Sequence, residues 1–262
     1  MSDNGVVFLM YHELESPGRP PSQTDPGYHR YIVPASEFCS QMQLLHRQGW
    51  RGVSVGSAIA AFAEKTVAIT FDDGCETDLL SAAPALKEIN FGATFYITTS
   101  YLGKTGHLSP SQLREVQRLG FEIGCHSMSH AYLTDLNDRD LRREVGESKM
   151  QLEQILGRAV EHFSCPGGRY DRRVSDTVRE AGYRTLTTSR VQRNFRNSDR
   201  FALGRVSVMR STSLAEFERI SKGHSLWPVR MQSQLRSAGQ KFLGNSLYDR
   251  LRAAILRDRA SS

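Results

Sequence analysis

Residues 67–74 read Val-Ala-Ile-Thr-Phe-Asp-Asp-Gly, an apolar run of strand length that ends in two adjacent carboxylates and a glycine. An Asp-Asp-Gly sequence by itself is typical of a turn. Side by side, however, Asp72 and Asp73 repel, and each raises the pKa of the other unless a cation is present. Such a strand end therefore predicts a functional site if other strands of the same sheet are also followed by polar, chemically reactive residues.

Outward from this stretch, strand-like and helix-like segments alternate along the chain. Strands are predicted at 6–10, 67–71, 93–97, 121–125, 162–165, 183–187 and 201–208, and helices at 37–48, 79–89, 109–119, 138–156, 175–181 and 214–221. Residues 13–34 are rich in Pro, Gly and Ser and are predicted to form a long loop. Strands that alternate with helices predict an α/β fold with a parallel sheet, and about seven of them favour a barrel. In such barrels the chemistry lies at the carboxyl ends of the strands.

Two histidines, His126 and His130, come directly after the predicted strand 121–125. Their i, i+4 spacing would place both imidazoles on one face of a helical turn, which is a geometry that grips divalent metals. One carboxylate with two imidazoles leaves coordination positions open for water and substrate.

Two further segments follow predicted strands. His12 comes after the strand 6–10, and Ser164-Cys-Pro-Gly-Gly-Arg-Tyr-Asp171 begins at the end of the strand 162–165. Two glycines after a proline allow a close backbone approach and can expose an N–H group to an anion. Four segments with candidate site residues thus lie directly after predicted strands, where the chemistry of such barrels is found.

The composition sets outer limits on the function. The chain has 262 residues, 39% hydrophobic and 24% charged, which is typical of a globular protein. No apolar stretch approaches the ~18 residues of a membrane span. Four cysteines without a C-x-x-C pair predict reduced thiols rather than a zinc finger, and we expect Cys75, Cys125 and Cys165 to be small buried packing residues. The first residues lack the features of a secretory signal, so we expect a cytoplasmic protein.

The motifs together are similar to those of a known enzyme family. Thr70-Phe-Asp-Asp-Gly74, His126-Ser-x-x-His130 and the loop 164–170 resemble the NodB-homology polysaccharide deacetylases, carbohydrate esterase family 4. The resemblance covers roughly residues 5–210, and the opening Leu9-Met-Tyr-His12 is similar to the subgroup that acts on bacterial exopolysaccharides. It implies a distorted (β/α)7 barrel, with a domain that spans residues 1–225.

The resemblance also implies roles for individual residues. Asp73, His126 and His130 would be the metal ligands and Asp72 the general base. His12 would be the general acid, because the late Leu-x-His of many relatives is here Leu203-Gly-Arg205. The N–H group of Gly167 would donate a hydrogen bond to the oxyanion that forms when water adds to the acetyl carbonyl. The implied cofactor is a divalent metal, most often Zn, with Co, Ni or Fe as alternatives. The implied substrate is an N-acetylated amino-sugar polymer or oligomer.

This sequence departs from the family pattern in the loop after 162–165. The usual Arg-x-Pro-aromatic motif appears as Ser164-Cys-Pro166-Gly167, so the arginine that orients the base and the aromatic wall are both absent. Arg169 or Arg205 could replace that arginine. We expect the remaining residues of the loop to contact substrate, namely Pro166, Gly167, Arg169 and Tyr170.

Two other functions fit parts of the pattern. Two histidines and a carboxylate also form the facial triad of non-haem Fe(II) oxygenases, although the alternation of strands and helices argues against their antiparallel sandwich. The altered loop at 164–167 could instead indicate a carbohydrate-binding pseudoenzyme of the same fold, although the retained Asp72, Asp73, His126 and His130 argue against it.

The charge is concentrated in the last 33 residues. Residues 230–262 carry seven basic and two acidic side chains, which is +5 of the formal net charge of +6. A near-neutral body with a basic appendage predicts no nucleic-acid partner. Residues 226–262 are predicted to form a basic amphipathic helical tail. This tail either docks on the barrel or lies on an anionic membrane surface, as a peripheral contact.

Overall fold

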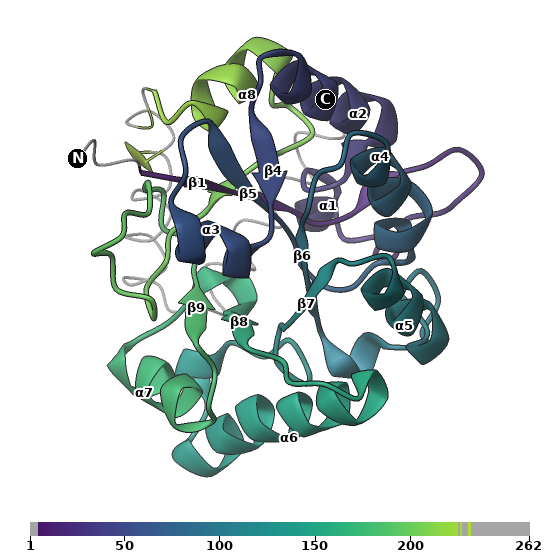
Figure 1. The fold of residues 1–262 in the computed structure, drawn as a ribbon. Helices are drawn as coiled ribbons and strands as arrows, with labels where there is room; N and C mark the ends of the chain where they lie inside the picture. Colours follow the sequence, from purple (N-terminus) through teal and green to yellow (C-terminus); the bar gives the residue numbers. More distant parts are fainter. Residues whose placement is uncertain (1–4, 225, 227–229, 232–262) are drawn as a thin grey trace.

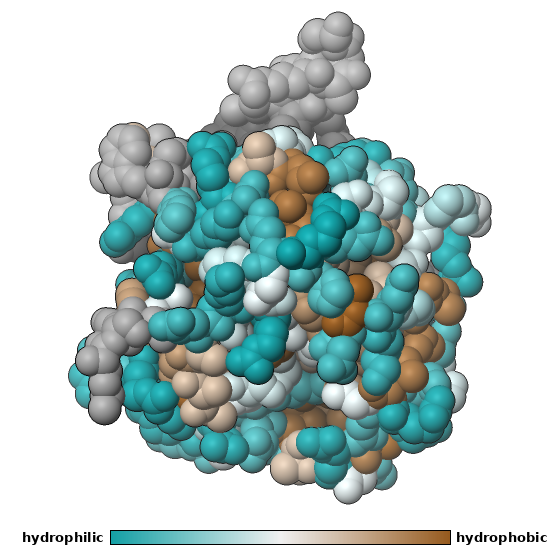
Figure 2. Space-filling view, turned by 45° about the horizontal axis from the view of Figure 1, so that its top comes forward, coloured by the Kyte–Doolittle hydropathy of each residue, from teal (hydrophilic) through white to brown (hydrophobic). Residues whose placement is uncertain are grey.

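The computed structural model describes residues 5–224, 226, 230 and 231 (Figure 1). The predicted helical tail at 226–262 lies almost entirely outside the described residues, and the domain boundary at 225 stays a prediction with it. No helix among the described residues is both long enough and apolar enough to span a membrane. Figure 2 shows a mostly hydrophilic face, on which the brown hydrophobic patches are separated by polar residues.

A parallel sheet of eight strands forms the centre of the molecule, as the alternation of strands and helices predicts. Seven strands follow one another in the order β10-β1-β5-β6-β7-β8-β9, and β4 pairs with the first half of β5. The bounds are β1 Val7–Tyr11, β4 Arg51–Val53, β5 Thr66–Phe71, β6 Thr94–Ile97, β7 Glu122–Cys125, β8 His162–Ser164, β9 Thr185–Thr187 and β10 Val206–Ser207. A small separate pair consists of β2 (Leu14–Glu15) and β3 (Val33–Pro34).

The two edges of this sheet are joined by one short segment. Leu203 bridges Thr187 of β9 in parallel, and three residues later Val206 of β10 pairs with Leu9 of β1. The predicted strand at 201–208 is therefore shortened to two residues, because its backbone bonds first to one edge and then crosses to the other. The result is the distorted (β/α)7 barrel that the sequence predicts.

Helices surround the barrel and cover one of its ends. In Figure 1, α2 (Ala35–Arg47), α4 (Ala83–Glu88), α5 (Pro110–Arg118), α6 (Asp138–Leu156), α7 (Arg172–Glu180) and α8 (Leu214–Ser221) lie around the sheet. The short α3 (Val55–Ala61) packs Val55, Ala58 and Ile59 against Phe8 and Tyr96 in a separate apolar cluster. The amide of Val55 bonds to Thr94 at the start of β6. The amino ends of the strands are thus covered, and the carboxyl ends remain for a site.

Some elements were not anticipated from the sequence. The long loop 13–34 contains β2, β3 and the short α1 (Pro26–His29), and β4 and α3 were not predicted at all. The predicted helix 79–89 begins as a π-helix at Asp78–Ala82 before it continues as α4. α3 is hard to predict because Val-Gly-Ser at its start forms helix poorly. It begins there because the Ser54 side chain accepts a hydrogen bond from the amide of Ser57.

Strand alternation directs the functional residues into the barrel. Successive side chains of a strand point to opposite faces. Tyr11, Phe71, Cys125 and Cys165 all belong to the core between sheet and helices. The residues next to them, His12, Asp72, His126 and Ser164, therefore turn to the barrel interior at its carboxyl end. The prediction that Cys75, Cys125 and Cys165 are buried packing residues is confirmed.

Candidate active site

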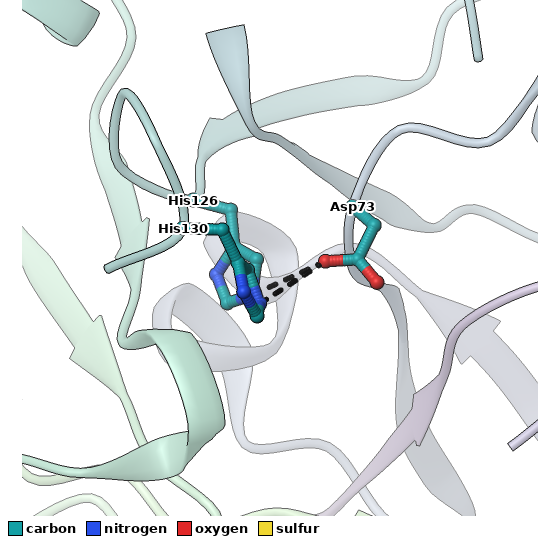
Figure 3. A group of neighbouring side chains, drawn as sticks. All are labelled: Asp73, His126 and His130. Carbon is teal, nitrogen blue, oxygen red and sulfur yellow. Dashed lines mark ion pairs between the residues drawn. The ribbon is translucent and has the colours of Figure 1, made fainter. Parts of the chain in front are cut away.

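Three side chains converge beyond the ends of β5 and β7 (Figure 3). The Nε2 atoms of His126 and His130 lie 3.7 Å and 3.4 Å from the same oxygen, Oδ1 of Asp73. All three ligand atoms lie within 4.8 Å of one another. Within the described chain, this Asp73 oxygen is buried and has no hydrogen-bond partner. An oxygen left without a donor between two imidazole nitrogens fits a divalent cation, because such a cation binds this donor set.

The orientation of His126 supports the same interpretation. Its Nδ1 lies 2.8 Å from the backbone carbonyl oxygen of Ser164. A carbonyl only accepts, so Nδ1 carries the proton and the Nε2 lone pair faces Asp73. Burial lowers the pKa of His126 to about 4, although Asp72 works in the opposite direction. The imidazole is therefore neutral near pH 7, as a metal ligand must be.

The predicted helical turn between the two histidines is wrong. Residues 126–130 form a loop in which Ser127 and His130 have positive φ values of 65° and 64°. Glu144 of α6 imposes this shape, because its carboxylate accepts hydrogen bonds from the amides of Met128 and Ser129 and from the Ser129 hydroxyl. The two imidazoles thus lie together because the Glu144 hydrogen bonds hold the loop in this conformation, and not because the residues are one helical turn apart.

Replacing Glu144 by Ala should weaken cation binding while leaving the barrel folded. The loop at 127–130 would lose the acceptor of three hydrogen bonds, and loss of such supporting groups typically costs 10–100-fold in metal affinity. Competition with a calibrated chelator measures the change. Glu147→Ala is the matched control, because Glu147 lies on an outer turn of the same helix and pairs with Arg143. Equal affinities for the two variants would show that Glu144 does not position the loop.

Asp72 is held by a buried arginine. Arg205 donates from both terminal nitrogens to the two oxygens of Asp72, at 2.7 Å and 2.8 Å, and also donates to the hydroxyl of Ser164. Burial alone would raise the pKa of Asp72, but Arg205 and His126 outweigh it and hold the pKa below its ordinary value. Of the two arginines considered for the missing motif position, the structure places Arg205 beside the carboxylate. The guanidinium of Arg169 instead lies 3.6 Å from the centre of the Tyr132 ring.

His12 follows β1, which pairs in parallel with β5, so it lies at the same end of the sheet as Asp72. Its Nδ1 is buried without a hydrogen-bond partner in the described chain, and its ring lies 4.7 Å from that of Tyr31. Burial lowers the pKa of His12, and the negative charges of Asp73 and Asp72 partly offset that effect. His12 is therefore close enough to both carboxylates to sense their charge.

The chain at the end of β8 reaches the site through Ser164, the last residue of that strand. Ser164 contacts Asp72 with its hydroxyl and His126 with its carbonyl. The Cα of Gly167, at a φ of 62°, packs so closely on Tyr132 that a Cβ atom would lie 2.8 Å from the ring. Pro166 is buried, and Tyr170 lies under the guanidinium of Arg190 at 5.2 Å.

Sequence reasoning missed several residues that shape the site. Glu144 had a detectable signal, because it lies on the buried stripe of α6 with Leu141, Val145 and Ser148. Tyr31, whose ring lies against His12, comes from a loop, and Tyr101, whose ring lies against His130, ends the short 3-10 helix Thr99–Tyr101. Their positions depend on how the loops fold over the barrel end.

Known proteins are similar to this chain in the region that carries these residues. A family model described as polysaccharide deacetylase matches residues 60–186, which include Asp72, Asp73, His126 and His130. YxkH of Bacillus subtilis (strain 168) is 27% identical over 218 residues, covering 81% of this chain and 74% of YxkH. A peptidoglycan-N-acetylglucosamine deacetylase of Bacillus cereus is 32% identical over 127 residues, covering 48% of this chain and 57% of that protein. In residues 60–186 the chain is therefore similar to the polysaccharide deacetylases, and this similarity indicates a hydrolase.

Solved structures show the same fold. The Streptococcus pyogenes deacetylase PplD, in complex with acetate, superposes with a TM-score of 0.74 at 21% identity, over 84% of this chain and 99% of that one. IcaB from Ammonifex degensii gives a TM-score of 0.73 at 23% identity, over 84% and 97% of the two chains. These likenesses establish the barrel architecture.

Proposed function

We propose that this protein removes N-acetyl groups from amino sugars of a bacterial poly- or oligosaccharide, in a reaction that depends on a divalent cation held by Asp73, His126 and His130. The observation that carries the proposal is the buried, unpartnered Asp73 oxygen between two imidazoles, with the arginine-held carboxylate of Asp72 beside it. The naming of one relative as a peptidoglycan-N-acetylglucosamine deacetylase supports the choice of an acetamide substrate.

Asp72 is suited to accept the proton of the attacking water. When bound, a divalent cation supplies a Lewis acid that polarises the acetyl carbonyl and makes a water easier to deprotonate. Asp72 is ionised, and Arg205 and Ser164 fix its orientation. A base in a fixed orientation can take the proton without first reorganising.

The developing oxyanion and the leaving amine need two further groups. The amides of Gly168 and Arg169 already bond to backbone carbonyls of the same turn, so we propose the amide of Gly167 as the donor to the oxyanion. An amine leaves readily only when it is protonated. His12, which follows the strand next to β5, is the proposed acid that protonates the sugar nitrogen.

Replacing His12 by Ala should lower kcat by on the order of 10²–10⁴, the usual worth of a positioned proton donor. Cation content should stay at the wild-type level, because His12 is not one of the three ligands. Single-turnover acetate release and elemental analysis measure the two quantities. His46→Ala is the control variant, because His46 is exposed on α2, and His224 is the next candidate for the acid. Near-normal kcat for His12→Ala would assign the proton transfer to another residue.

Incubation with N-acetylglucosamine oligomers tests the reaction itself, because mass spectrometry detects one free amine for each acetate released. The oxygenase alternative requires consumption of O₂, and the parallel sheet differs from the antiparallel sandwich expected of such an oxygenase. The pseudoenzyme alternative requires sugar binding with no acetate released.

The membrane contact rests on the sequence of the tail and the cytoplasmic location on the composition of residues 1–10, and both are proposals. Each basic residue near an anionic surface contributes roughly 1 kcal/mol, and this contribution falls with salt. Deleting residues 230–262 should therefore abolish salt-sensitive sedimentation with anionic vesicles while soluble oligomers are still deacetylated. A full-length protein that ignores such vesicles at low salt would overturn the membrane proposal.

A further inference from the structure

A surface hollow of about 620 Å³ lies beside the candidate metal centre. Its lining includes Ser22 and Gln23 from the segment before α1, and Tyr101, Lys104 and His107 from the segment after β6. The Tyr101 ring lies 6.1 Å from that of His130 and nearly parallel to it, at 28°. Tyr101 thus separates the hollow from a proposed metal ligand, and a volume of this size is within the range of small-ligand sites.

His107 gives the hollow a buried hydrogen-bond acceptor. Only 8% of its surface is exposed, and its Nδ1 lies 3.2 Å from the carbonyl oxygen of Thr105. The carbonyl can only accept, so Nδ1 carries the proton and Nε2 is left with a lone pair. In the part of the chain that the structure describes, Nε2 is buried and has no partner. A buried acceptor without a donor costs free energy, and a sugar hydroxyl would satisfy it.

Lys104 gives the hollow an uncompensated positive charge. Its ammonium lies over the Tyr101 ring, 5.4 Å from the centre, and it forms no ion pair with any described residue. The nearby carboxylates are engaged elsewhere. Glu13 accepts hydrogen bonds from the amide and hydroxyl of Ser22, and Glu76 binds Arg19 and Gln112. An anionic group in the hollow would therefore meet a cation without competition from these acids.

We propose that this hollow binds the sugar adjacent to the acetylated unit, and that Lys104 favours a sugar that bears a carboxylate or a phosphate. The inference rests on the proposed deacetylase function and names its substrate class. The Tyr101 ring forms a wall for the sugar, His107 accepts a hydroxyl proton, and Lys104 forms a charge-assisted hydrogen bond with the anion.

Three size-matched substrates test this inference. One is a neutral N-acetylglucosamine tetramer, the second alternates N-acetylglucosamine with glucuronic acid, and the third carries phosphodiester links between N-acetylglucosamine units. At low salt, the wild-type protein should have a KM about tenfold lower for one anionic substrate than for the neutral one, with similar kcat. The preference should shrink as salt is added, because exposed charges are screened. The two anionic arms distinguish carboxylate from phosphate.

Variants assign the preference to particular side chains. Lys104→Ala should remove the preference by raising the KM for the anionic substrate toward that for the neutral tetramer, whereas Lys104→Arg should retain the preference. Lys87→Ala at the end of α4 is the control for a surface lysine. His107→Gln should raise the KM for all three tetramers but not for monomeric N-acetylglucosamine, which leaves the hollow empty.

Different results would overturn the proposed sugar-binding hollow and the proposed deacetylase function. Equal KM values for the three substrates, or a preference that survives Lys104→Ala, would overturn the inference while the deacetylase function stands. If no substrate releases acetate, the proposed function fails, and calorimetric binding of the same tetramers then decides the inference alone. Tighter binding of an anionic tetramer that is lost in Lys104→Ala would support it, and equal binding would overturn it.

Discussion

Replacing Asp73, His126 or His130 by alanine should remove the bound cation and the turnover together. Each residue supplies one of the three ligand atoms, and two ligands hold a divalent cation far more weakly than three. Elemental analysis after gel filtration measures the cation, and acetate release measures turnover. We expect each variant to hold less than about a tenth of the wild-type cation content. Loss of a residue that only supports a ligand already lowers metal affinity by about 10–100-fold.

His46→Ala is the matched control, because His46 is exposed on the outer helix α2. It should retain both cation and turnover. A His130→Ala protein with full cation content would contradict the assignment of this triad. Loss of turnover with the cation still bound would contradict it as well, since the residue would then act in another way.

Replacing Arg205 by Met should destabilise the folded protein by about 3–5 kcal/mol, because it leaves the charge of Asp72 buried without its partner. The guanidinium is fully buried and bonds to both oxygens of that carboxylate. Urea denaturation followed by circular dichroism measures the change. The double variant Asp72→Asn with Arg205→Met should recover part of the lost free energy of unfolding. The stability effects of two residues that contact each other are not additive.

Asp72→Asn alone should retain the cation and lose on the order of 10²–10⁴ in kcat, as expected for removal of a general base. Arg205→Lys keeps the positive charge but cannot bond to both oxygens at once, so its kcat should fall between those of the wild type and Asp72→Asn. Wild-type stability in Arg205→Met would show that the pair does not hold Asp72 in place.

The barrel could be predicted because its strands are local apolar patterns. The runs 67–71 and 121–125 are strand-like by themselves, and α6 was predicted with the bounds that the structure shows, Asp138–Leu156. The closure of the barrel at Leu203 and Val206 could not be foreseen, since it depends on hydrogen bonds to two distant strands rather than on local pattern. The same holds for α3, whose place is decided by the barrel interior that it covers.

The positions of site residues that directly follow a strand could be predicted. The positions of those that depend on the conformation of a loop could not. Strand alternation turns Asp72 and His126 inward, so their meeting follows from the sheet. His130 arrives through a loop that Glu144 pins from a helix, and helix periodicity gave the wrong local geometry. Two arginines were equally plausible partners of Asp72 in the sequence. Only the crossing of the chain at β10 places Arg205, rather than Arg169, beside it.

The proposed reaction is a cation-dependent removal of acetyl groups at Asp73, His126 and His130. The most direct measurement is acetate release from N-acetylglucosamine oligomers by wild-type protein before chelation, after chelation and dialysis, and after addition of one equivalent of Zn²⁺ or Co²⁺. The account predicts turnover that is lost with the cation and regained at one cation per chain. Acetate release that continues unchanged in protein shown to contain no metal would contradict it.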